Sequence, residues 1–130
     1  MARLTIRIDF DDGSGLGPGK VRLLELVAET GSIRKAAAAL GMSYRKAWLL
    51  LQALKDTFGA PLIETVSGGK SGGGTKLTAT GREIVSRYRK LEQAAGKAAA
   101  ANLQALTRRA RINKSNQLKI NDIHFSKTMN

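Results

Sequence analysis

The sequence contains no cysteine, only one histidine and few aromatic side chains. The lack of cysteine excludes a disulfide scaffold, a cysteine-based zinc site and a cysteine nucleophile. The single histidine, His124, lies in a polar C-terminal stretch without a carboxylate partner in a segment expected to be ordered. Because aromatic residues make up 5% of the chain, the core must consist mainly of Leu, Ile, Val and Ala. We find no catalytic constellation and no metal-ligand set, and we expect a protein that is not an enzyme.

Long apolar runs are also missing. A bilayer span needs about 20 mostly apolar residues in a row, and no segment approaches that length. The N-terminal residues alternate between polar and apolar side chains instead of forming the apolar core of a signal peptide. We therefore expect a cytoplasmic protein that does not span a membrane.

The charge of the chain is strongly one-sided. Its 130 residues include 22 Lys and Arg against 10 Asp and Glu, which gives a net charge of +12. Such an excess favours a polyanionic partner, because cations that neutralise phosphates release condensed counterions. Nucleic acid is the leading candidate, with a membrane surface or plain solubility as the alternatives. The length allows one ordinary domain with a modest core.

Hydrophobic periodicity and turn residues predict a mainly α-helical fold with a small β component. Residues 3–10 alternate as in a half-buried strand and lead into a glycine-rich loop. The remaining predicted elements are helices over 20–30, 33–40, 44–58 and 81–110, and short strands over 62–66 and 75–79. The expected helix N-caps are Ser32, Ser43 and Thr80. We expect residues 111–130 to form a polar, poorly ordered tail.

The segment Gly31–Trp48 has the sequence Gly-Ser-Ile-Arg-Lys-Ala-Ala-Ala-Ala-Leu-Gly-Met-Ser-Tyr-Arg-Lys-Ala-Trp. It predicts two short helices joined by a tight turn at Gly41, the unit that places its second helix in the DNA major groove. The small side chains of Ala36 and Ala37 allow the two helices to approach each other closely. A small helical bundle with a solvated basic face is the alternative.

A turn of 100° per residue sets the faces of the second helix. With Ala47 at the centre of the buried face, Leu51 and Leu54 point inward, Leu49 points outward, and Trp48 lies at an edge, in the core or on the surface. Arginine can grip guanine, glutamine can pair with adenine, and apolar side chains can meet the thymine methyl group. The expected DNA-binding residues of the two helices are Ser32, Arg34, Lys35, Ser43, Tyr44, Arg45, Lys46, Trp48, Leu49 and Gln52.

A glycine-rich hairpin follows the second helix, and this order predicts a winged helix-turn-helix. We expect its tip, residues 67–74, to be flexible and to bring Lys70 and Ser71 to a phosphate backbone. A surface loop without a partner is the alternative. A nucleotide-binding loop is disfavoured, because Glu64 stands where that motif requires its first glycine.

These motifs resemble the N-terminal DNA-binding domain of the ModE family of molybdate-responsive regulators, and more distantly that of LysR-type regulators. The resemblance covers residues 3–95 and rests on Glu29–Ile33, Ala36 and Ala37, Gly41–Trp48, Pro61–Glu64, Gly68–Gly74, Leu77 and Thr78, and Gly81. It implies a dimeric transcription regulator, with repression favoured, that binds a palindromic operator. It also implies that the fourth helix and the N-terminal region help to pair the subunits.

Full members of the ModE family also carry C-terminal modules that bind molybdate, and 130 residues are too few to include them. Ser115–Lys119 resembles the opening of such a module. We therefore expect no cofactor, with molybdate only as the effector of the family. Two alternatives stay open: a molybdate sensor that uses a residual or inter-subunit oxyanion site, and an interaction protein that pairs with a full-length relative and modulates it.

The helix predicted over 81–110 is longer than a DNA-binding domain requires. Its apolar positions from Ile84 to Ala110 follow helical spacing, and beyond Ala95 little of the domain remains to cover them. Residues 82–119 carry ten basic and two acidic side chains, which meet flanking DNA or form a solvated face. We predict a DNA-binding domain over 1–80, a dimerisation helix over 81–110 and the tail over 111–130. The expected partners are double-stranded DNA and a second copy of the chain, without a membrane.

Overall fold

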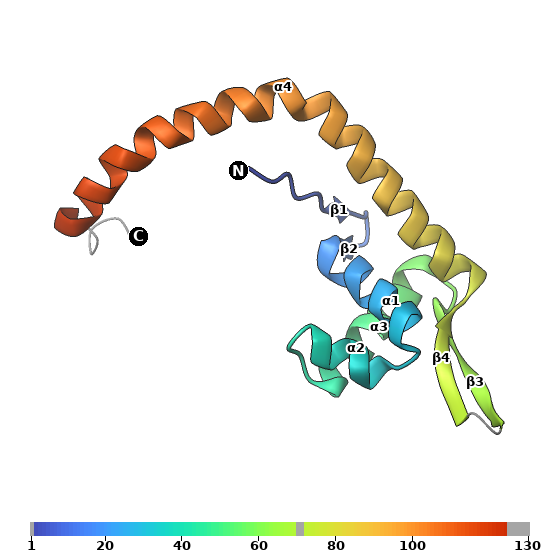
Figure 1. Ribbon diagram of the computed structural model, residues 1–130. Helices are drawn as coiled ribbons and strands as arrows, with labels where there is room; N and C mark the ends of the chain where they lie inside the picture. Colours follow the sequence, from blue (N-terminus) through green and yellow to red (C-terminus); the bar gives the residue numbers. More distant parts are fainter. Residues whose placement is uncertain (1, 70–71, 125–130) are drawn as a thin grey trace. The chain divides into compact units, whose positions relative to one another are not determined.

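The computed structural model describes residues 2–69 and 72–124, with side chains beyond Ala110 outside the description. Its elements are two short strands, three helices, a second pair of strands and a long helix (Figure 1). This mainly helical winged helix-turn-helix confirms the predicted fold class. The chain divides into two compact units, Thr5–Glu92 on the one hand and Met1–Leu4 with Gln93–Asn130 on the other. Over the described ranges, no helix combines the length and apolarity that a membrane crossing requires.

Three helices form the core of the unit Thr5–Glu92, namely α1 (Pro18–Thr30), α2 (Ile33–Ala39) and α3 (Tyr44–Phe58). The predicted bounds of α3 are confirmed, and α2 ends one residue earlier than predicted, at Ala39. α1 begins earlier than predicted, at the proline whose fixed φ suits the first helical position. The side chains that helical spacing placed inward on α3, Ala47, Leu51 and Leu54, are buried as predicted. The core also contains side chains from the other helices and from the strands and loops, among them Leu16, Leu23, Leu24, Val27, Ala36, Ala37, Leu62 and Leu77.

The N-terminal hairpin is shorter than the sequence predicted. β1 (Ile8–Asp9) pairs antiparallel with β2 (Gly15–Leu16). The prediction of a strand over 3–10 is wrong, because the chain turns back at Gly13 and offers only two residues for pairing. The predicted alternation is nevertheless present, since the half-buried residues of this segment are Ile6, Ile8 and Phe10.

The wing consists of β3 (Ile63–Gly69) and β4 (Gly72–Leu77), which pair antiparallel with a register irregularity near the tip. The sequence predicted strands that end at Val66 and begin again at Thr75, and both bounds are wrong because the strands continue into the glycine run. Gly73 allows this close pairing, since a Cβ atom there would lie 2.8 Å from the carbonyl oxygen of Val66. Glycine at this position therefore serves strand pairing.

The long helix α4 (Ala79–His124) begins directly after the wing. Its N-cap is Thr78, and the prediction of Thr80 is wrong. The Thr78 hydroxyl accepts a hydrogen bond from the Gly81 N–H (3.1 Å) and donates one to the Pro61 carbonyl (2.8 Å). The sequence offered two threonines close together, and the contact with Pro61 selects the first of them.

The end of α4 also differs from the prediction. The helix continues to His124, although the sequence predicted an end near Ala110 and a poorly ordered tail. No glycine or proline interrupts residues 111–124, so no local signal stops the helix. The division of roles among residues 1–80, 81–110 and 111–130 remains a prediction.

Two contacts fix the first turns of α4 within the unit Thr5–Glu92. The hydroxyl of the buried Tyr88 donates to the carbonyl of Ile6 (2.6 Å), and burial raises the pKa of Tyr88. Arg89 donates to both carboxylate oxygens of Glu25 on α1, at 3.0 and 2.6 Å. These hydrogen bonds to Arg89 lower the pKa of Glu25. Both contacts were invisible in the sequence, because their partners lie far apart along the chain.

Candidate DNA-binding surface

Two serine caps and one glycine set the geometry of the helix-turn-helix. The Ser32 hydroxyl accepts a hydrogen bond from the Lys35 N–H (3.1 Å) at the start of α2. The Ser43 hydroxyl accepts one from the Lys46 N–H (3.0 Å) at the start of α3. Between the helices, Gly41 adopts a φ of 67°, in the left-handed region that favours glycine. These local contacts confirm the predicted caps and fix the direction in which α3 leaves the turn.

The outward face of α3 is exposed and partly apolar. The side chains of Tyr44, Trp48 and Leu49 are 43%, 45% and 49% exposed, whereas Ala47 of the same helix is fully buried. The predicted register of α3 is therefore confirmed, and the alternative that placed Trp48 in the core is wrong. Contiguous apolar side chains on a surface mark interaction sites more often than scattered ones do.

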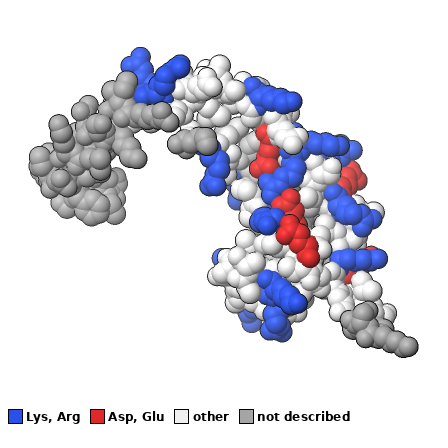
Figure 2. All heavy atoms as spheres, in the orientation of Figure 1, with Lys and Arg blue, Asp and Glu red and all other residues white. Residues whose placement is uncertain are grey.

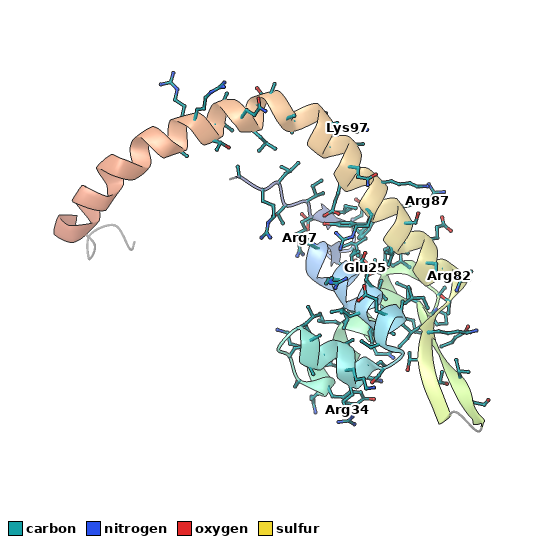
Figure 3. All side chains as sticks on the ribbon, in the orientation of Figure 1. Arg7, Glu25, Arg34, Arg82, Arg87 and Lys97 are labelled. Atoms are coloured by element: carbon teal, nitrogen blue, oxygen red, sulfur yellow. The ribbon has the colours of Figure 1, made fainter. Side chains whose placement is uncertain are left out.

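Arg34 and Tyr44 join the first turns of the two helices. The guanidinium carbon of Arg34 lies 4.6 Å from the centroid of the Tyr44 ring, and Figure 3 shows Arg34 on the outside of α2. A cation over an aromatic face is attracted by the quadrupole of the ring. The sequence predicted both residues for the site but did not predict this contact. Arg34 and Tyr44 lie in different helices, and the number of residues between them does not determine which side chains meet.

The other predicted residues lie around this stack. Lys35, Arg45 and Lys46 are exposed in the first turns of α2 and α3, and Gln52 is half-buried further along α3. The structure thus brings Arg34 and Tyr44 together and leaves the other predicted residues of the two helices exposed or half-buried. Lys70 and Ser71 of the wing lie outside the described residues.

The helix-turn-helix segment of the candidate surface is predominantly basic. The segment Ser32–Lys55 contains five Lys and Arg residues and no Asp or Glu. Figure 2 shows acidic side chains over α1 and the first turns of α4, whereas the visible surface over α2 carries only Lys and Arg. On α1, Glu25 and Glu29 are paired with Arg22 at 3.5 and 3.1 Å. A positive field beside hydrogen-bonding and apolar side chains suits a phosphate backbone together with base edges.

The wing is fixed to the end of α1, next to the start of α2. The Thr75 N–H of β4 donates to the carbonyl of Gly31 (2.9 Å). A Cβ atom on Gly74 would lie 3.1 Å from the same carbonyl oxygen, so a larger residue there would crowd this contact. Across the wing, Lys76 and Glu64 form an ion pair at 3.5 Å. The base of the wing is therefore held relative to the two helices that carry the candidate surface.

Lys55 is a further candidate that the sequence analysis did not place in the site. It lines, with Trp48 and Gln52, a hollow of about 160 Å³ between α3 and the start of β3. Its spacing from these two residues was the available signal, because positions three or seven apart share one helix face. Lys55 extends the basic surface of α3 toward the wing.

The groups on this surface suit binding to a duplex. They are cations, hydroxyl and amide groups, and exposed apolar side chains. Within residues 2–68 and 73–110, no three His, Asp or Glu side chains gather where they could hold a metal ion. In the same ranges no polar or charged residue is buried.

Comparison with known proteins identifies relatives of this domain. Residues 19–82 match the family described as bacterial regulatory helix-turn-helix protein, lysR family. The chain is 41% identical over 92 residues to the molybdenum transport protein ModE of Azotobacter vinelandii, which covers 71% of this chain and 33% of that protein. It is 36% identical over 81 residues to the DNA-binding transcriptional dual regulator ModE of Escherichia coli strain K12, which covers 62% of this chain and 31% of that protein. The chain thus spans about a third of the length of the curated relatives it matches.

A solved structure gives the same picture of the fold. The crystal structure of the CbnR_DBD–DNA complex is similar to this chain with a TM-score of 0.52 and 26% sequence identity. The match covers 67% of this chain and 94% of that one. The similar structure is thus itself a DNA-binding domain in complex with DNA.

Proposed function

Because residues 19–82 form a helix-turn-helix domain of the LysR family, homologous to the N-terminal region of ModE proteins, we propose that this chain regulates transcription by binding a specific DNA sequence. The domain is related to the DNA-binding domains of transcriptional regulators. We extend this relation to a homodimer that binds a palindromic operator and acts as a repressor. Such a regulator works in the cytoplasm, where bacterial DNA lies.

The observation that carries the proposal is the exposed face of α3 within the segment Ser32–Lys55, which contains five basic residues and no acidic one. Arg45 can donate two hydrogen bonds to guanine, and Gln52 can pair with adenine. Trp48 and Leu49, each more than two-fifths exposed, offer apolar contacts to a thymine methyl group. The stack of Arg34 on Tyr44 holds a guanidinium at the border of this face, within reach of a phosphate. Base contacts of this kind give specificity, whereas the surrounding cations give affinity.

A homodimer follows from the need to bind both halves of a palindrome. Two recognition helices must lie one DNA turn, or a multiple of one turn, apart. In the second unit of the chain, α4 carries Leu103 half-buried and Leu106 65% exposed, on positions that share a helix face. We propose this stripe as the seam between two copies. The same stripe favours one alternative, an interaction protein that pairs with a full-length relative.

The test is selection of binding sites from a pool of random DNA duplexes. We expect enrichment of a two-fold symmetric site, and we expect Arg45→Ala to weaken binding to that site by about 1–3 kcal/mol. Lys90→Ala is the matched control, because Lys90 is an exposed cation on α4. A pool without enrichment would contradict sequence-specific binding. Dimers that form without any DNA affinity would favour the interaction protein instead.

A further inference from the structure

A second basic feature, which we call the N-terminal cleft, lies beside the start of α3. It has a volume of about 450 Å³ and is lined by the N-terminal hairpin, the start of α1 and the start of α3. Three of its lining side chains are cationic, namely Arg7, Lys20 and Lys46. No acidic side chain lines the cleft among the described residues. A concave surface lined by cations raises the local concentration of anions.

Two of these cations are held close to one glycine. The ammonium group of Lys20 donates to the carbonyl of Gly15 (2.9 Å). The guanidinium of Arg7 lies across the same residue, since a Cβ atom on Gly15 would be 2.5 Å from Arg7 Nη2. Arg7 Nε donates to Asp9 (2.7 Å), which leaves the two terminal nitrogens for another partner. The buried Gly15 thus has both positive groups against it, and an anion that contacts both groups would be stabilised by them.

The cleft is continuous with the surface proposed for DNA recognition. Lys46 belongs to both, because it lies in the first turn of α3 and its side chain lines the cleft. Met42 before α3 and Leu50 within it complete that wall of the cleft. A helix in the major groove has a row of phosphates on each side of the bases that it contacts. The N-terminal cleft lies where one of these rows can continue past α3.

We propose that the N-terminal cleft binds a backbone phosphate of the DNA that flanks the bases contacted by α3, with Arg7 and Lys20 as its cationic ligands. This inference rests on the proposed function and extends the DNA footprint beyond the helix-turn-helix and the wing. Two cations of this kind suit a phosphate group, because charge-assisted hydrogen bonds to phosphate are strong. Contacts with the DNA bases are not needed for this binding. The contact adds affinity and register but no sequence preference.

The test compares two double variants that remove the same charge. Arg7→Gln with Lys20→Gln empties the cleft of two cations, whereas Arg22→Gln with Lys90→Gln removes two exposed cations that do not line it. We expect the cleft variant to lower the slope of log K against log salt by about 1–2, since each lost phosphate contact changes it by about 0.9. Its ratio of specific to non-specific affinity should stay unchanged. The control variant should keep nearly the whole wild-type slope.

Two further arms identify the source of the phosphate. On a duplex shortened to the bases that α3 contacts, the flanking phosphate is absent. The wild type and the cleft variant should then have the same salt slope. The charge-preserving variant Arg7→Lys with Lys20→Arg should restore the slope on the long duplex. Thermal unfolding of each variant by circular dichroism checks that the fold is intact.

Three results would overturn the inference. Equal slopes for the cleft and control variants would mean that the cleft does not contact DNA. A cleft variant that loses affinity for inorganic phosphate but keeps the wild-type slope would assign the cleft to a free anion. A wild-type chain without DNA affinity would remove the proposed function itself, and this result is distinguishable because it precedes every comparison of variants.

Discussion

Gly81, at the start of α4, has no room for a larger side chain. A Cβ atom there would lie 2.2 Å from the carbonyl oxygen of Leu62 and 3.1 Å from its carbonyl carbon. Carbon and carbonyl oxygen atoms normally approach each other only to about 3.3–3.6 Å. The same carbonyl accepts a hydrogen bond from the Thr78 N–H (2.9 Å). Gly81→Ala must therefore move the start of β3 or the first turn of α4.

The size of the effect follows from three contributions. Overpacking of this kind costs about 1–3 kcal/mol. Loss of the hydrogen bond between Thr78 and Leu62 adds about 1 kcal/mol. Against this, alanine is about 1 kcal/mol better than glycine inside a helix. We expect a net loss of roughly 1–3 kcal/mol in the free energy of unfolding, which in a domain of this size lowers Tm by roughly 5–20 °C.

Gly96→Ala is the matched control, because both glycines lie in α4 and no atom lies within 4 Å of a Cβ atom placed on Gly96. This substitution should raise helix stability by up to about 1 kcal/mol without a steric cost. Thermal and urea unfolding, followed by circular dichroism, measure both variants. If Gly81→Ala were as stable as the wild type or more so, the close approach of α4 to Leu62 would be refuted.

Three other predictions concern the anchoring of α4 and the effector. Glu25→Gln removes a carboxylate whose pKa is lowered from 4.5 by its hydrogen bonds to Arg89. The stability contributed by this pair is present above the ordinary pKa and lost as the pH falls through the lowered one. Urea unfolding should therefore show a deficit for the variant at pH 7 that shrinks in acid. Tyr88→Phe, measured in the same way, should cost about 1 kcal/mol through loss of the hydrogen bond to Ile6. Molybdate should leave DNA affinity unchanged in a filter-binding assay, because we expect no molybdate site in this chain, and a shift in affinity would favour the alternative of a residual or inter-subunit oxyanion site.

The sequence predicted the helix-turn-helix well because its signals are local. Ser32 and Ser43 precede helical periodicity, and a single glycine, Gly41, separates the two helices. The register of α3 followed from placing Ala47 inward, and the exposure of Leu49 confirms it. Caps, turns and helical periodicity each depend on only a few neighbouring residues. Such features need no knowledge of which distant segments meet.

The errors and omissions lie where distant segments decide the structure. The wing strands extend into the glycine run, where Gly74 pairs with Val66 and Gly73 lies close to the Val66 carbonyl oxygen. Thr78 caps α4 because its hydroxyl also reaches Pro61, seventeen positions away. The N-terminal cleft joins Arg7 to the start of α3. None of these pairs has a spacing that a local pattern could predict, since tertiary packing sets them.

The most direct test of the central claim is the affinity of the wild-type chain for its selected duplex and for a scrambled duplex across a salt series. The account predicts a preference for the selected duplex of about 10³ or more at physiological salt. It also predicts that log K falls linearly with log salt for both duplexes, because cations of the protein replace counterions on the phosphates. Equal affinity for the two duplexes, or binding that does not change with salt, would contradict the claim that this surface recognises DNA.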